Sequence, residues 1–236
     1  HQDYIGFTNP EGCNTGEYGD ESDVDERLWA FSELLRTDYE IRNEKDHSMM
    51  AGMPQKMSRQ RLYQLEVLQL LDQCMEKDTA DMQKGIFSDG FGWSEVQGLS
   101  ALAILFDERM TAGGEIMKKI SAHLYNKADR LLQIQQENGY LVAMRPQDFV
   151  WGSNMVVTNR ADLLITAALF AEREIEMDEA GVNFDQTGLI KVIEYSVHNT
   201  QEPVRMTENE LADRKRKIVQ YEAAAMEHLH YIAGRN

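Results

Sequence analysis

Apolar side chains recur along most of this chain at intervals of three and four residues, which is the spacing of one face of an α-helix. In the first such run, Val24, Leu28, Phe31 and Leu35 share a face, and the oxygen-bearing side chains of Asp20, Ser22 and Asp23 precede it as candidate caps. The pattern predicts six helices, over about residues 24–35, 58–75, 94–106, 117–137, 157–174 and 208–232.

Two of these helices carry more specific predictions. The one from Val157 to Glu174 is apolar nearly all round, so we expect it to be an inner, buried helix that covers both Leu164 and Leu169. The helix that begins near Met117 should stop at Asn138–Gly139 in a left-handed cap, and Gly234 should end the last helix in the same way.

Strand signals are weak. Residues 140–151 hold at most a short extended piece, which Pro146 interrupts. Because no signature repeats at a period of 30–45 residues, a tetratricopeptide or HEAT array is disfavoured. The sequence therefore predicts an all-α chain, with residues 1–236 forming a single helical domain.

Composition narrows the function. With 236 residues, 42% of them apolar and 27% charged, the chain is typical of a soluble globular protein. A net charge of −16 excludes nucleic acid as a partner, since a polyanion binder needs clustered cations. The basic run at 214–217 follows acidic residues and is interpreted as a solvated helix face.

The longest apolar run, Leu99–Phe106, is too short to span a membrane. Cys13 and Cys74 either form a bridge or are two buried thiols.

Four segments, in this order, resemble glycoside hydrolase family 9, the family of many cellulases. They are NTGEYGD (14–20) leading into DVDERLWAFSELLRT (23–37), FGWSEVQGLSALAIL (91–105), NGY with DFVWGSNMVVTNRADLLITAALF (138–140 and 148–170), and LHYIAGRN (229–236). The resemblance implies an (α/α)6 toroid, incomplete in this chain, with a cleft at one end for β-linked glucan or a related saccharide. It also implies a secreted or periplasmic protein, and a partner in the remaining segments of the catalytic domain.

Three aromatic residues at loop-to-helix junctions are candidates for binding a saccharide. Tyr18, Trp93 and Trp151 match family segments, and flat rings stack on the C–H-rich faces of pyranoses. Asn154, in the Trp-Gly-Ser-Asn element, is the polar candidate beside them. The alternative is that a tryptophan at a helix start only packs. Trp29 differs from these, because it lies in an apolar helix stripe and is predicted to be core.

A structural calcium site is the one cofactor that the sequence suggests, since the chemistry itself requires none. The resemblance places an Asp-Glu pair of calcium ligands at Asp25 and Glu26, and Asp23 precedes it. The family often has a further acidic ligand directly after the position of Trp93, where this chain has Ser94. The alternative is that these carboxylates only favour the helix dipole.

The catalytic motifs of the family are not found in this sequence. The family carries its general base in an Asp-Ala-Gly-Asp motif, which this sequence lacks, and its general acid in an Asn-Glu motif. Asn209–Glu210 precedes the LHYIAGRN segment, whereas the family's acid follows it, so we reject Glu210 as the acid. His228 and His230 point to different sides of a helix and form no metal site.

The sequence thus predicts part of an inverting glycoside hydrolase, with cleft residues but no catalytic carboxylate, so that the chain alone would be inactive. The alternatives are a non-catalytic helical saccharide-binding protein and a protein-interaction scaffold.

Overall fold

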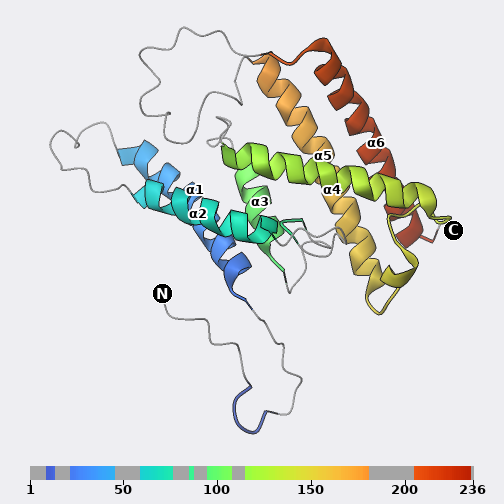
Figure 1. Ribbon diagram of the computed structural model, residues 1–236, viewed down its shortest axis with the longest axis horizontal. Helices are drawn as coiled ribbons and strands as arrows, with labels where there is room; N and C mark the ends of the chain where they lie inside the picture. The colour runs from blue at the N-terminus through green and yellow to red at the C-terminus, as the bar shows by residue number, and fades with distance from the viewer. Residues whose placement is uncertain are drawn as a thin grey trace.

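The computed structural model describes residues 9–13, 22–45, 59–76, 85–87, 95–107, 115–180 and 205–234. Within these ranges the chain is all-helical and contains no β-strand. The elements are α1 (Val24–Lys45), α2 (Arg59–Glu76), α3 (Gln97–Leu105), α4 (Glu115–Glu137), the 3₁₀ turn η2 (Pro146–Asp148), α5 (Ser153–Glu179) and α6 (Glu208–Ile232), as Figure 1 shows. The prediction of an all-α chain is confirmed.

The helices pack as two groups. Helix α1 packs against α2, which returns in the opposite direction, and against α3. Helices α5 and α6 form a long antiparallel hairpin, and α4 crosses this hairpin and also contacts α3 (Figure 1). The two helices of the hairpin contribute small buried side chains, and such side chains let neighbouring backbones approach closely: Ala167, Ala168, Ala171, Ala224 and Ala225.

Hydrogen bonds show that α1 and α3 run in one direction, and they join α5 to the end of α3. Asp107, directly after α3, is buried, and its Oδ2 accepts a hydrogen bond from Arg36 Nε at 3.2 Å. Its carbonyl oxygen accepts one from Arg173 Nη2, late in α5, at 3.2 Å. At the opposite end, the N–H of Val96, before α3, donates to Asp25 Oδ2, in the first turn of α1, at 2.9 Å. Helices α1 and α3 therefore begin side by side.

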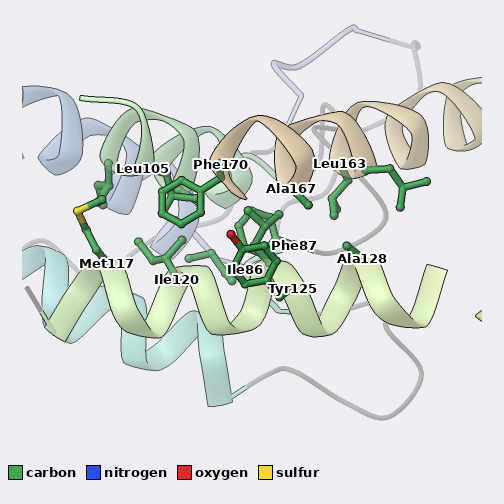
Figure 2. Close-up of a cluster of buried hydrophobic side chains, with 14 of the residues drawn as sticks. Ile86, Phe87, Leu105, Met117, Ile120, Tyr125, Ala128, Leu163, Ala167 and Phe170 are labelled. Carbon is green, nitrogen blue, oxygen red and sulfur yellow. The ribbon is translucent and has the colours of Figure 1, made fainter. Parts of the chain in front are cut away.

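The hydrophobic core takes residues from all six described α-helices, and one part of it lies where α3, α4 and α5 meet. Figure 2 shows Leu105 of α3, Ile120 of α4 and Phe170 of α5 pointing toward one another, with Ile86 and Phe87 from a separate turn closing the cluster. Aromatic rings contact one another in this cluster. The centroid of the Phe170 ring lies 6.1 Å from that of Phe106 and 6.2 Å from that of Tyr125.

Two predictions of burial are wrong. Leu164 is fully buried in α5, but Leu169 is 49% exposed and Ile165 is also exposed, because one face of α5 is not covered by any of the described helices. Trp29 is 39% exposed rather than core. It lines an open groove of about 330 Å³ between α1 and α3.

The ends of α2, α3, α4 and α6 lie at or near the predicted residues, whereas α1 continues ten residues beyond Leu35, and α5 is four to five residues longer at each end than predicted. Helix α4 stops at Glu137, but Gly139 is not in the left-handed region; the positive φ, 55°, belongs to Leu141. Gly234 does end α6 with φ 78°, as predicted. Residues 140–151 form bends and η2 instead of an extended piece. Cys13 is exposed, Cys74 is buried, and no disulfide joins them.

Leu164 and Leu169 make a matched pair for testing this fold. We expect Leu164→Ala to lower the free energy of unfolding by about 2–5 kcal/mol, because it leaves a cavity in the core. Leu169→Ala should change it by less than about 1 kcal/mol, because half of this side chain already faces solvent. Urea denaturation followed by circular dichroism measures both, and equal losses would contradict the placement of α5.

Candidate functional site

The connection between α4 and α5, residues 138–152, presents the most exposed aromatic side chain among the described residues. Trp151 is 100% exposed, and both faces of its indole are open. Gly152 follows with φ 80°, a left-handed conformation that turns the chain sharply into α5. We call residues 138–152 the Trp151 loop.

Arg160 of α5 fixes the Trp151 loop through hydrogen bonds to two of its residues. Its side chain is buried, and its Nη1 donates to Asp148 Oδ2 at 2.8 Å and to the carbonyl oxygen of Ala143. Asp148 Oδ2 also accepts a hydrogen bond from the N–H of Arg145 at 2.9 Å. Although burial opposes ionisation of Asp148, these bonds hold the pKa of its carboxyl below the ordinary value. The ion pair therefore persists at neutral pH.

His228 of α6 also binds Ala143, the loop residue whose carbonyl oxygen Arg160 contacts. Its ring is fully buried, and Nε2 accepts a hydrogen bond from the N–H of Ala143 at 2.9 Å. Since Nδ1 lies 2.8 Å from the carbonyl oxygen of Ala224, Nδ1 carries the proton and the ring is neutral. Burial lowers the pKa of His228. Helix α4 adds a third hold, because Gln135 Nε2 donates to the carbonyl oxygen of Leu141 at 2.8 Å.

The structure describes two of the four predicted saccharide-binding residues. Trp151 is exposed on the loop, and Asn154 is exposed one residue after α5 begins. Tyr18 and Trp93 lie outside the described residues, six residues before Val24 of α1 and four before Gln97 of α3. Whether the four line one cleft stays a prediction.

The predicted calcium ligands are described, but they make other contacts. Asp25 accepts the hydrogen bond from Val96, Asp23 lies 3.7 Å from Arg27 in an i,i+4 ion pair, and Glu26 is exposed. Among the described residues, no group of three or more His, Cys, Asp or Glu side chains could hold a metal ion. These three residues do not form a calcium site by themselves, and the calcium prediction depends on residues outside the described ranges.

Glu210, the third residue of α6, forms a reciprocal capping box with Thr207. Its N–H donates to Thr207 Oγ1 at 3.2 Å, and its Oε2 accepts from the N–H of Thr207 at 2.8 Å. These hydrogen bonds lower the pKa of Glu210. A general acid needs the opposite shift, so the structure supports a structural role for Asn209–Glu210.

A buried polar cluster was not predicted. Glu174 of α5 is buried, and its Oε2 accepts a hydrogen bond from Tyr125 Oη at 2.5 Å and lies 2.7 Å from Arg214 Nε. Burial raises the pKa of both Glu174 and Tyr125. Lys217 Nζ lies 2.8 Å from Asp129 Oδ2 in the same region.

The prediction of a solvated basic face is therefore wrong for Arg214 and Lys217, although Arg216 is exposed. The sequence contains a sign that these two cations face other helices, because Arg214, Lys217 and Tyr221 follow helical spacing on one face of α6. That face meets α4 and α5.

Comparisons with known proteins find similarity to a cellodextrinase and to endoglucanases. No family model matches it. It is 30% identical over 168 residues to the cellodextrinase of Butyrivibrio fibrisolvens, across 70% of this chain and 26% of that protein. It is 26% identical over 161 residues to endoglucanase D of Acetivibrio thermocellus, across 68% of this chain and 21% of that protein. The chain thus spans about a quarter of the length of these relatives.

One of the similar solved structures shows a likeness of fold. The structure of AaCel9A in complex with cellobiose-like isofagomine has a TM-score of 0.50 and 19% identity, over 94% of this chain and 47% of that chain. The glycoside hydrolase family 9 endoglucanase J30 has a TM-score of 0.49 and 25% identity, over 77% and 30%. In the part of the chain that the structure describes, no helix has the length and apolarity needed to cross a membrane.

The buried, neutral His228 predicts a pH dependence of stability. Its pKa is lower in the folded chain than the value of about 6.5 in the unfolded chain, so the unfolded chain binds the proton first as the pH falls. The stability that His228 contributes should be complete above about pH 6.5 and be lost progressively below it.

We expect His228→Gln to flatten this slope in urea midpoints measured between pH 5 and 8. His230→Gln is the matched control, because His230 lies two residues away, is partly exposed and pairs with Glu227. It should keep the slope. An unchanged slope in His228→Gln would refute the assignment.

Proposed function

We propose that this chain, a relative of the glycoside hydrolase family 9 enzymes in sequence and in fold, belongs to a protein that hydrolyses β-linked glucan. Its own contribution is part of the saccharide-binding surface, built around Trp151. The names of the two curated relatives, a cellodextrinase and an endoglucanase, support this class of substrate. Since a polysaccharide does not cross a membrane unaided, we expect such a protein to act outside the cytoplasm.

The observation that carries the proposal is a fully exposed indole on a loop held by three helices. Leaving a side chain of this size in water forfeits about 1.5–3 kcal/mol of burial free energy, so its display favours a binding role. Arg160, His228 and Gln135 hold the loop in place before any ligand arrives. A preformed site loses little conformational entropy on binding, and this raises the affinity.

The chemistry of the loop suits a sugar. The face of a pyranose ring presents C–H groups, which stack on an indole, while its edge presents hydroxyls. The exposed amide of Asn154, three residues after Trp151, supplies both a donor and an acceptor for such hydroxyls. We therefore assign Trp151 to stacking and Asn154 to orienting the ring.

Neither catalytic role is assigned to a described residue. An inverting hydrolase needs a general base and a general acid with carboxyl groups about 6.5–9.5 Å apart. Glu210 is held in the cap of α6, and Asp148 is paired with Arg160. Both carboxylates thus have structural partners instead of an open site.

A protein-interaction scaffold is the second candidate. Val219, Met226 and Leu229 of α6 are each at least 44% exposed and share an apolar stripe. A stripe of this kind can mark a surface for another helix. Association that depends on protein concentration and is unaffected by saccharide would favour this candidate.

Trp151→Ala tests the binding proposal. Truncating a central aromatic contact should weaken the affinity for cellotetraose by about tenfold or more, since such residues contribute upwards of about 1–2 kcal/mol. Isothermal titration calorimetry measures the loss, and the melting temperature should stay unchanged because the side chain contacts solvent. Trp29→Ala, which removes a partly exposed indole from the groove on α1, is the control and should bind normally. Equal affinity in wild type and Trp151→Ala would remove the basis of the proposal.

Hydrolysis by the chain alone is a separate test. We expect purified residues 1–236 to release no reducing sugar from soluble β-glucan, because each missing proton-transfer group forfeits about 10²–10⁴-fold in rate. If turnover is nevertheless found, Glu210→Gln shows whether Glu210 causes it. Turnover abolished by Glu210→Gln would overturn the assignment of Glu210 as a cap alone.

A further inference from the structure

We propose that Tyr140, Phe149 and Tyr231 form a second aromatic platform, which binds the sugar units of a β-glucan chain that extend beyond Trp151. This inference rests on the proposed function, and it names how the site favours long saccharides over short ones. We call the three residues the Tyr140 platform.

The three rings come from separate parts of the chain and meet edge to face. The Tyr140 centroid lies 6.4 Å from that of Phe149, with the ring planes at 63°, and 6.0 Å from that of Tyr231, at 67°. Tyr140 follows α4, Phe149 follows η2, and Tyr231 lies in the last turn of α6. Contacts of this geometry stabilise ring pairs and fix their relative orientation.

The platform faces solvent although its members are aromatic. Tyr140 is 56% exposed and Phe149 is 38% exposed, while Tyr231 is half-buried and packs against the buried Val142, Met144 and Val157. Tyr140 therefore stands at the centre of the platform with much of its ring open. Its phenolic hydroxyl adds a hydrogen-bonding group beside the ring, the combination that saccharide recognition uses.

The backbone that carries Tyr140 is built to hold it in place. The N–H of Tyr140 donates to Asn138 Oδ1 at 2.8 Å, and Asn138 Nδ2 donates to the carbonyl oxygen of Met144 at 2.6 Å. The next residue, Leu141, has φ 55°, which a residue with a side chain seldom adopts. Backbone strain of this kind persists where surrounding contacts enforce it, and it is concentrated at ligand sites.

Continuity with Trp151 favours a saccharide as the occupant. Phe149 and Trp151 are two residues apart on the same held loop, so the platform and the indole belong to one surface. Tyr140, Phe149 and Trp151 thus follow one another as successive exposed aromatic side chains. A linear glucan can occupy such a series with successive rings, whereas a disaccharide needs only one part of it.

The test compares saccharides of two lengths, cellobiose and cellohexaose, by calorimetric titration of the full chain. Tyr140→Ala should weaken cellohexaose binding by about two- to tenfold, as expected for losing one aromatic contact, and leave cellobiose binding unchanged. Tyr140→Phe keeps the ring and should restore most of the affinity. Val219→Ala, which removes an exposed apolar side chain elsewhere on α6, is the control and should bind both sugars normally.

The outcomes separate the two proposals. If Trp151→Ala weakens binding but Tyr140→Ala binds cellohexaose as wild type does, the platform is wrong and the proposed function stands. If Tyr140→Ala weakens both sugars equally, the residue supports the loop as a whole and the platform is again wrong. If the wild-type chain binds neither sugar, the proposed function fails and the platform fails with it.

Discussion

The buried guanidinium of Arg160 is the constraint on which the candidate site depends. A cation removed from water must be paired, and Asp148 and the carbonyl oxygen of Ala143, which accept hydrogen bonds from Arg160, both belong to the Trp151 loop. Loss of the Asp148 carboxylate alone would leave this buried charge without its counterion, at a cost of about 3–5 kcal/mol. The exposed indole is therefore displayed on a segment that cannot easily rearrange.

Polar contacts of the same kind join the helices elsewhere. Apolar faces attract one another without direction, so they determine which surfaces meet but not their register. Asp107 ties the late parts of α1 and α5 to the end of α3, Asp25 ties the beginnings of α1 and α3, and Glu174 ties α5 to α4 and α6. Each of these contacts is directional and sets a register.

Different residues therefore stabilise the fold and form the proposed binding surface. The ion pair between Glu174 and Arg214 joins α5 to α6, and the loop that carries Trp151 lies at one end of this hairpin (Figure 1). Carboxylates that resemble catalytic or metal-binding groups in the sequence are used as supports: Glu210 caps a helix, and Asp25 joins two helices. The exposed Trp151 and Asn154 have no comparable structural task in the described contacts of their side chains.

Local patterns determined the helices. The spacing of apolar residues predicted all six α-helices, and Gly234 predicted the end of α6, because these features depend on neighbours within one or two turns. The resemblance of four segments supplied the fold class and pointed to Trp151 and Asn154. Only the tertiary structure decided which helix faces were covered: it paired the partly buried Arg214 and Lys217 with carboxylates, left Leu169 and Trp29 exposed, and joined Asp25 to Val96. Burial depends on which element packs against a face, and those elements are distant in sequence, so no local pattern contains that information.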